Sequence, residues 1–366
     1  MTEVAVRGRA TRRFSAFRIV QIVVGAAVGG FIIWRLLFLV VTGQYGPEFW
    51  ARILIGGLII GAVYALIAIG YTLVYGILRM INFAHGEVFM TGTFGGYFVL
   101  EGLGAIIVDP ATGTNFRDAF PVVAILVAFA VGIAVSLSVA FMLEQIAYRP
   151  LRKAPRLIPL ISAIGASFFL QNLFQLIFGA QRRLYPNPTS LNAHLGLVFD
   201  INGSSVIIPY TGALTFVLAV TLMAALYTLV QRTRLGRAMR AVAEDKQTAA
   251  LMGIDVDRVI SQTFLISGSL AGAAAVMWGL HYGQISFFIG FTPGIKAFTA
   301  DVLGGIGNIP GAMLGAMLIG LIEAIGPAVL GINPQLKDVI AFMVLVLVLL
   351  FRPSGILGEV LSEEKV

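Results

Sequence analysis

The sequence contains no cysteine, which excludes disulfide bonds and thiolate metal sites. Histidine is also rare, and the three histidines, His85, His194 and His281, are too far apart in sequence to indicate a metal site. Neither a Walker motif, a zincin motif nor a nucleophile triad occurs, so nothing in the chain is suited to bind and hydrolyse ATP. We therefore expect a non-catalytic protein with no metal or cofactor of its own.

Charge is scarce as well, because only 12% of the residues are charged, whereas a soluble domain carries about 25%. Hydrophobic residues make up 58% of the chain and the mean hydropathy is +0.93. The 42 glycines and 26 phenylalanines suit helices that pack closely in lipid. We expect an all-α integral membrane protein, a polytopic bundle of about nine or ten transmembrane helices, some of them broken or re-entrant.

Apolar runs define the candidate membrane spans, since a helix needs about 20 apolar residues to cross. The third, the eighth and the last are short or interrupted, which is typical of half-helices or re-entrant segments. The ten candidate spans cover residues 19–41, 53–77, 86–104, 121–145, 157–179, 211–231, 259–281, 285–305, 310–331 and 336–351.

The basic residues predict the orientation of these spans. With the N-terminus inside, eighteen Lys and Arg residues fall on the inner side and five on the outer side, which is a strong positive-inside bias. The loops 148–156 and 232–258 and both termini are then cytoplasmic, and the segment 180–210 is external. This placement of the net charge of +7 beside membrane spans argues against nucleic-acid binding.

The N-terminal apolar run 19–41 is longer than the core of a typical signal peptide and lacks a small-x-small cleavage site. We expect a retained anchor helix in which Arg35 snorkels toward the outer interface. The predicted regions are a basic tail with this anchor at 1–44, a transmembrane domain at 45–358 and a cytoplasmic tail at 359–366.

The polar segment 232–258 is too long for a simple turn, and it predicts a short amphipathic helix over 237–252. Ala249, Ala250 and Met252 are expected to form a small, smooth surface, and Gly253 with Ile254 to form the C-terminal cap. A motor protein could seat this helix in a groove. The alternative is a solvated loop whose charges only set the topology, but topology alone does not require a capped helix. The candidate coupling residues are Arg240, Glu244, Asp245, Ala249, Ala250, Gly253 and Ile254.

A polar cluster at 81–87 (INFAHGE) lies between two apolar spans, near the cytoplasmic interface. Ionisable groups at membrane depth indicate function, so Asn82, His85 and Glu87 are candidates for a gate or a lining of the translocation path. Equally, Asn82 or His85 could cap a helix whose positive end faces Glu87.

A polar stripe runs through the span 157–179, where Ser167, Gln171 and Gln175 recur every four residues and share one helix face. Such a stripe faces the interior of a helix bundle. It either holds helices together, which we favour, or lines a water-filled path.

Glycine marks the expected close contacts between helices. Gly-x-x-x-Gly pairs begin at Gly57, Gly268 and Gly311, and the segment 303–312 (LGGIGNIPGA) predicts a sharp turn or a broken helix. Its Gly-x-Gly has no βαβ context and is not a dinucleotide fingerprint. The candidate packing or turn residues are Gly268, Gly272, Gly304, Gly305, Gly307, Pro310 and Gly311.

Three charged residues fall within the last spans. Lys296 and Asp301 could pair inside one span, although five residues is not ideal helical spacing, and Glu323 is a lone acid. An ion-coupled carrier acting alone would need such buried acids. The simpler interpretation is that they pair structurally or lie near interfaces.

As a set, these features resemble the LivH-type permeases of branched-chain amino acid ABC importers, the LivH/LivM permease family. The resemblance runs from residue 53 to residue 358, whereas the residues before 44 depart from the family's pattern. The matching stretches are 70–76 (GYTLVYG), 81–87, 148–152 (YRPLR), 160–165 with 169–172, 241–245 with 253–254, and 296–299 through 302–307 to 310–312.

The resemblance implies a translocation path in a bacterial inner membrane for leucine, isoleucine or valine delivered by a periplasmic binding protein. It also implies a sister permease subunit of the LivM type and two ATPase subunits that bind ATP and Mg. The loop around Glu244 to Ile254 looks like the coupling helix of such importers. The alternatives are a permease of the same family for urea, short amides or other amino acids, an ion-coupled carrier, and a passive channel.

Overall fold

A computed structural model describes residues 16–152, 154–155, 157–191, 195–201, 203–352 and 354–358. The predicted basic tail up to residue 15, the tail 359–366 and His194 lie outside these residues. Within them, every element longer than six residues is a helix. The prediction of an all-α membrane bundle is confirmed.

Seven helices in the described part of the chain are long and apolar enough to cross a membrane. Their apolar residues match the predicted spans because bilayer thickness sets the length of an apolar run. These spans are Pro47–Leu78 (α2), Pro121–Leu151 (α5 and the turns that continue it), Leu157–Phe178 (α6), Tyr210–Arg232 (α7), Val256–Tyr282 (α10), Ile309–Leu330 (α12) and Pro334–Phe351 (a turn and α13).

Three expected spans are not among these seven. The N-terminal helix α1 (Ala16–Thr42) is apolar over Val23–Leu39, and α3 (His85–Ala105) is interrupted by glycine and polar residues. The helix α11 (Phe291–Gly304) has 14 residues and therefore spans about 21 Å, less than the roughly 30 Å of the hydrocarbon core. It is a half-helix, as the short eighth run indicated. The last run, in contrast, is long enough once its leading turn is included.

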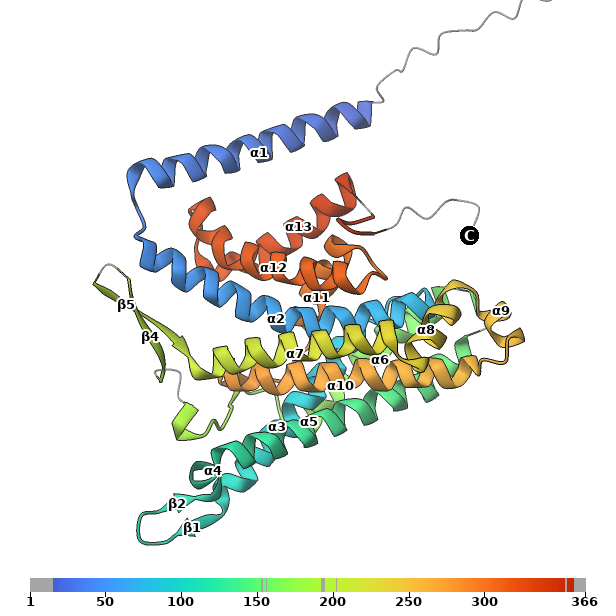
Figure 1. Cartoon of the computed structure of the whole chain (residues 1–366), viewed down its shortest axis with the longest axis horizontal. Helices are drawn as coiled ribbons and strands as arrows, with labels where there is room; N and C mark the ends of the chain where they lie inside the picture. The colour runs from blue at the N-terminus through green and yellow to red at the C-terminus, as the bar shows by residue number, and fades with distance from the viewer. Residues whose placement is uncertain are drawn as a thin grey trace, which may run out of the picture.

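The helices α2 and α10 form the centre of the bundle, and they lie side by side with α7 in Figure 1. Every residue of α2 from Gly61 to Val74 is buried, and so is every residue of α10 from Leu270 to Met277. A helix that is apolar all round either contacts lipid or is covered by protein, and the burial of these residues shows that protein covers them. The other spans therefore surround these two, with α12 and α7 against α2 and with α5 and α3 against α10.

Glycine allows the closest helix contacts. A Cβ on Gly320 of α12 would lie 2.4 Å from the carbonyl oxygen of Gly57 in α2, and a Cβ on Gly272 of α10 would lie 2.7 Å from Cα of Ile133 in α5. Any larger side chain would have to push these backbones apart. Gly268, one turn from Gly272, meets Ala140 and Leu137 of α5 in the same way. Both contacts follow the small-xxx-small pattern of membrane helices.

Short elements occupy the two ends of the bundle (Figure 1). At the left end are two antiparallel hairpins, one of them pairing Gly196 with Pro209 through to Ile201 with Ser204. At the right end are α8 (Arg234–Glu244) and α9 (Lys246–Leu251). We call these the hairpin end and the α8–α9 end. The remaining elements are α4 (Phe116–Ala119), β1 (Ile107–Asp109), β2 (Thr114–Asn115), β3 (Arg183–Leu184), β4 (Gly196–Ile201), β5 (Ser204–Pro209), β6 (Gln284–Ile285), η1 (Glu144–Tyr148), η2 (Arg149–Leu151), η3 (Thr189–Leu191), η4 (Pro334–Leu336), with α5 itself at Pro121–Leu143 and α13 at Lys337–Phe351.

The turn between α11 and α12 is as sharp as its glycines indicated. α11 ends at Gly304, and Gly305 and Gly307 follow with φ values of +112° and +91°, a region that other residues rarely adopt. Asn308 then caps α12 by accepting from the amide of Gly311 at 3.0 Å, and Pro310 lies in the first turn. The backbones of Gly304 and Gly311 pack directly against each other.

Candidate functional site

Two helices, α3 and α11, begin inside the bundle and not at its surface. A Cβ on Gly70 would lie 2.3 Å from Nε2 of His85, so α3 starts level with Gly70. Gly70 precedes the end of α2 at Leu78 by eight residues, which places the start of α3 about 12 Å inside the bundle at 1.5 Å per residue. The sequence predicts that this segment lies near the cytoplasmic interface, and its position relative to the bilayer stays a prediction.

The first turns of α3 and α11 meet at this depth. A Cβ on Gly86 would lie 2.6 Å from the carbonyl oxygen of Gly290, and a Cβ on Gly294 would lie 3.1 Å from Cα of Gly86. Only glycine permits this approach. Because a helix N-terminus carries a partial positive charge, two such charges converge inside the bundle. Non-helical backbone at membrane depth is tolerated where it is buried or lines a cavity.

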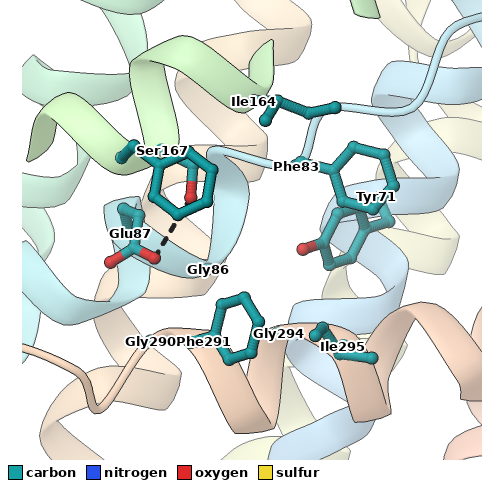
Figure 2. Close-up of a pocket in the computed structure, with 11 residues that line it drawn as sticks. Tyr71, Phe83, Gly86, Glu87, Ile164, Ser167, Gly290, Phe291, Gly294 and Ile295 are labelled. Atoms are coloured by element: carbon teal, nitrogen blue, oxygen red, sulfur yellow. Dashed lines mark hydrogen bonds between the residues drawn. The ribbon is translucent and has the colours of Figure 1, made fainter. Parts of the chain in front are cut away.

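A cavity of about 170 Å³ opens at this meeting point, between α2, α3, α6 and α11 (Figure 2). A single water needs only about 10–15 Å³ by a similar measure, so the space admits a small molecule. Its polar groups include Tyr71, Glu87 and Ser167. Its apolar walls are formed by Phe83, Ile164, Phe168, Phe291 and Ile295.

Glu87 is the acidic group of this cavity, and it is only 1% exposed. Its Oε1 accepts hydrogen bonds from Nε2 of Gln171 at 2.9 Å and from Oγ of Ser167 at 3.3 Å. Its Oε2 has no hydrogen-bond partner among the described residues. One carboxylate oxygen is thus fixed by α6, and the other is left to accept from a further group.

The other polar residues predicted for this region have different places. Asn82 accepts a hydrogen bond from the hydroxyl of Tyr148 at 2.6 Å, and His85 fills the gap beside Gly70 without lining the cavity. Neither side chain caps α3, whose N-cap is Ala84 with no side-chain cap hydrogen bond. The capping alternative is therefore wrong for Asn82 and His85, whereas Glu87 does lie in the first turn. Gln175, two turns beyond Ser167, is exposed.

A second cavity, of about 350 Å³, lies on the other side of the segment that leads into α11. Phe288, Thr292 and Pro293 line this second cavity, while Phe291 lines the first. The ring centroids of Phe288 and Phe291 are 4.9 Å apart, so one aromatic pair contributes a ring to each cavity. Sequence reasoning expected a short or re-entrant span here but did not assign it to the site, although its glycines, Pro293 and paired phenylalanines were the signal.

The family described as "Branched-chain amino acid transport system / permease component" matches residues 53–349, a range that includes both cavities and the α8–α9 end. The chain belongs to this permease family. The predicted membership is confirmed, and the residues before 53 lie outside the match. The permease's function as a non-catalytic transport component agrees with its lack of enzyme motifs.

Curated relatives cover nearly the whole permease. It is 48% identical to the high-affinity branched-chain amino acid transport permease protein BraD of Pseudomonas aeruginosa over 306 residues, 84% of this chain and 95% of BraD. It is 45% identical to the corresponding LivH of Escherichia coli over 303 residues, 83% of this chain and 94% of that protein. A probable LivH of Methanocaldococcus jannaschii is 27% identical, covering 84% of this chain and 92% of the relative. No solved structure matches the chain.

The polar loop of the permease forms two helices, not the single helix expected over 237–252. The break is at Asp245, whose Oδ1 accepts from the amides of Gln247 at 2.8 Å and Thr248 at 3.3 Å and so caps α9. The Thr248 hydroxyl also donates to Oδ2 of Asp245 at 2.5 Å, and these hydrogen bonds lower the pKa of Asp245. A short acidic side chain that binds the following amides favours a new helix start over a continuous helix.

The predicted cap after α9 is present. Gly253 has a φ of +83°, its amide donates to Ala250 at 3.0 Å, and the amide of Ile254 donates to Ala249 at 3.1 Å. This pair of hydrogen bonds is the Schellman motif. It fixes the direction in which the end of α9 points.

The exposed surface of this loop differs from the one expected. Ala249 is buried at 4% exposure and faces the bundle, whereas Leu251 and Met252 are 87% and 79% exposed. In α8, Met239 and Val242 are buried, while Glu244 ends the helix at the surface. The guanidinium of Arg240 donates to the carbonyl of Val230 and ties α8 to α7. The apolar tip is therefore Leu251 and Met252, not Ala249.

The charged residues of the last helices form a cluster between helices. Nζ of Lys296 lies 2.9 Å from Oε1 of Glu323 in α12 and 2.5 Å from Oδ1 of Asp338 in α13. Nζ of Lys337 is 3.1 Å from the same oxygen of Glu323. Asp301 instead accepts from the hydroxyl of Thr72 in α2. The predicted Lys296–Asp301 pair is wrong, and the simpler interpretation of Glu323, structural pairing, holds.

Proposed function

We propose that this permease forms the translocation path of an ABC importer for the branched-chain amino acids leucine, isoleucine and valine. The observation that carries the proposal is the 48% identity over 84% of the chain to a permease named for high-affinity transport of these substrates. The site agrees in character, because its cavity is mostly apolar, lies inside the bundle and contains a carboxylate. Intramembrane ionisable groups mark substrate pathways.

The α8–α9 end is the proposed attachment point of two partner ATPase subunits, which bind ATP and Mg. Leu251 and Met252 form an exposed apolar tip on a helix capped at both ends, and such a tip suits insertion into a groove. Movement of the ATPases can switch the permease between its inward-facing and outward-facing states only if they bind these two states with different affinity. A rigid, capped helix transmits such a difference. The excess of basic residues on this side supports the proposal that this end and both termini are cytoplasmic and that the hairpin end is external.

A sister permease subunit of the LivM type is the proposed neighbour of α6. Phe168 and Phe169 on this helix are 56% and 64% exposed, and Phe168 also lines the deep cavity. The cavity is therefore incompletely closed on the α6 side by this chain alone. A second permease covering this face would complete its wall. A periplasmic binding protein would deliver the substrate at the hairpin end.

The test is uptake by the assembled complex. The permease, its sister subunit and the two ATPases are reconstituted in proteoliposomes with the binding protein. We expect uptake of labelled leucine that requires ATP and stops when the Walker lysine of the ATPases is replaced. Isoleucine and valine should compete, whereas excess urea should not.

Three results would contradict the proposal. Uptake driven by an ion gradient without ATP would identify an ion-coupled carrier, and uptake that persists after ATP depletion and stops at equilibrium would identify a channel. Competition by urea but not by isoleucine would identify the family's urea type.

A further inference from the structure

We infer that the deep cavity binds the amino acid as a zwitterion, with Oε2 of Glu87 accepting from its ammonium group and the first turn of α11 receiving its carboxylate. The inference rests on the proposed function, because it names the groups that recognise that substrate. It is carried by three features of the cavity: an unpaired carboxylate oxygen, an uncapped helix N-terminus beside it, and apolar walls around both.

Glu87 supplies the first feature. It is the only carboxylate that lines the cavity, and no Lys, Arg or His side chain of the described residues lines it. Oε1 is held by Ser167 and Gln171, but Oε2 is buried with no hydrogen-bond partner in the described part of the chain. A buried charge is costly unless it is paired and hydrogen-bonded. An ammonium group would supply both the charge and the donor.

The N-terminus of α11 supplies the second feature. The start of α3 already has an acid, since Glu87 lies in its first turn. The first turn of α11 contains no acidic residue, and its N-cap, Gly290, makes no side-chain cap hydrogen bond. The carboxylate of Glu87 lies beside this end of α11. Of the first amides, that of Phe291 donates to Phe288 at 3.3 Å and Pro293 has no amide hydrogen, which leaves the amides of Gly290 and Thr292 to receive a carboxylate. Broken membrane helices present their N-termini to anionic substrate groups in the same way.

The two features are close enough for one α-carbon to serve both. Oε2 of Glu87 lies 3.1 Å from the position of a Cβ on Gly290, the residue that precedes α11. In an amino acid the nitrogen and the carboxyl carbon are about 2.5 Å apart, as standard bond lengths and angles require. An α-amino acid can therefore reach Glu87 with one group and the start of α11 with the other.

The apolar walls receive the side chain. Phe83, Ile164 and Ile295 surround the space beside Glu87 and Gly290 (Figure 2). A branched aliphatic side chain gains free energy on burial there, whereas a polar one would leave its donors or acceptors unsatisfied. Urea could donate to Glu87, but it has neither a carboxylate for α11 nor a side chain for these walls.

The first experiment replaces Glu87 in the complete complex. Glu87→Gln keeps the size of the side chain and removes its charge, and the matched control is Glu101→Gln, the same change at an exposed position of α3. We expect Glu87→Gln to lower the maximal rate of ATP-driven leucine uptake at least tenfold, with KM unchanged because the binding protein sets it. Glu101→Gln should transport as the native complex does. A Glu87→Gln complex that transports at the native rate would overturn the inference.

The second experiment measures binding without transport. Since the chain has no cysteine, Ile295→Cys places a single thiol in the cavity wall for labelling by methanethiosulfonate reagents. A cationic reagent should label faster than a neutral one, and Glu87→Gln should abolish the difference. Leucine should slow labelling, whereas 4-methylpentanoate, which lacks the amino group, and isopentylamine, which lacks the carboxylate, should not.

The outcomes separate this inference from the proposed function. Absence of ATP-driven leucine uptake by the native complex would refute the proposed function itself. If the native complex transports leucine, three results would refute only the zwitterion site. These are leucine protection that survives Glu87→Gln, equal protection by both analogues, and no protection by leucine at all. Native uptake with protection that requires Glu87, the amino group and the carboxylate would support it.

Discussion

The buried charge cluster of α11 and α12 offers a quantitative test of what holds the bundle together. Nζ of Lys296 lies 2.9 Å from Oε1 of Glu323, and the two side chains are only 3% and 1% exposed. Oε2 of Glu323 also accepts from the hydroxyl of Tyr64 at 2.9 Å. Glu323→Gln removes the charge and preserves the volume, so its effect reports mainly the electrostatic contribution.

The expected magnitude follows from these distances. Two unit charges 2.9 Å apart attract each other by about 6 kcal/mol at an effective dielectric constant of about 20. Lys296 keeps Asp338 as a partner, but that side chain is 44% exposed, so solvent screens part of its attraction. We expect Glu323→Gln to lower the free energy of unfolding by about 3 kcal/mol, at the low end of the range for breaking a buried ion pair. The double variant Lys296→Met with Glu323→Gln should recover most of this loss, because it leaves no buried charge unpaired and its amide oxygen can still accept from Tyr64.

The assay is equilibrium unfolding in mixed micelles with increasing sodium dodecyl sulfate. It is applied to the native permease, the single variants Lys296→Met and Glu323→Gln, and the double variant. The interaction free energy from this double-mutant cycle should exceed about 2 kcal/mol. If the two sites were independent, the single variants' changes in unfolding free energy would sum to that of the double variant within about 0.5 kcal/mol. Additive effects would refute the electrostatic reasoning. In addition, a stable double variant should retain ATP-driven uptake, since the pair is structural. Complete loss of uptake by that variant would favour an ion-coupled carrier.

Three further predictions concern the α8–α9 end and helix packing. Leu251→Arg, at a side chain 87% exposed, should leave folding unchanged yet uncouple ATP hydrolysis from uptake, and normal uptake would contradict docking there. Gly320→Leu should lower the free energy of unfolding by about 1–3 kcal/mol, because the Cβ of the new side chain would lie 2.4 Å from the carbonyl oxygen of Gly57. The control Gly102→Ala, where no atom lies within 4 Å, should be neutral or slightly stabilising in the same mixed-micelle unfolding assay. Since hydrogen bonds lower the pKa of Asp245, its cap on α9 should be complete at neutral pH. Hydrogen-exchange protection at 247–248 should disappear only as the pH falls below about 3.9, the unfolded value, and a loss near neutral pH would contradict this assignment.

The spans were predictable because hydropathy reports how much of a segment is apolar. Hydropathy does not report depth, so it could not show that α3 begins at His85 about 12 Å inside the bundle. That depth is set by glycine contacts with Gly70 and Gly290 from other helices. The carboxylate of the site, Glu87, and its hydrogen-bond partners Ser167 and Gln171 were identified from sequence, but the cavity residues at the start of α11 were not.

The errors at the α8–α9 end have a different cause. Residues 237–252 favour a helix throughout, and only the competition of Asp245 for the following amides breaks it. The same break turns Ala249 inward and Leu251 outward. The partner of Lys296 was likewise beyond reach from sequence, since Glu323 is 27 residues away and approaches only when α12 packs against α11.

The aromatic pair Phe288 and Phe291 bears on how the cell keeps its membrane potential. Phe291 lines the first cavity and Phe288 the second, and their rings, 4.9 Å apart, offer water no strong hydrogen-bonding partner. Protons cross membranes along unbroken files of water, and each charge that leaks dissipates about 2.3 kcal/mol per 100 mV of membrane potential. If these rings interrupt such a file of water, an idle permease would not discharge the membrane.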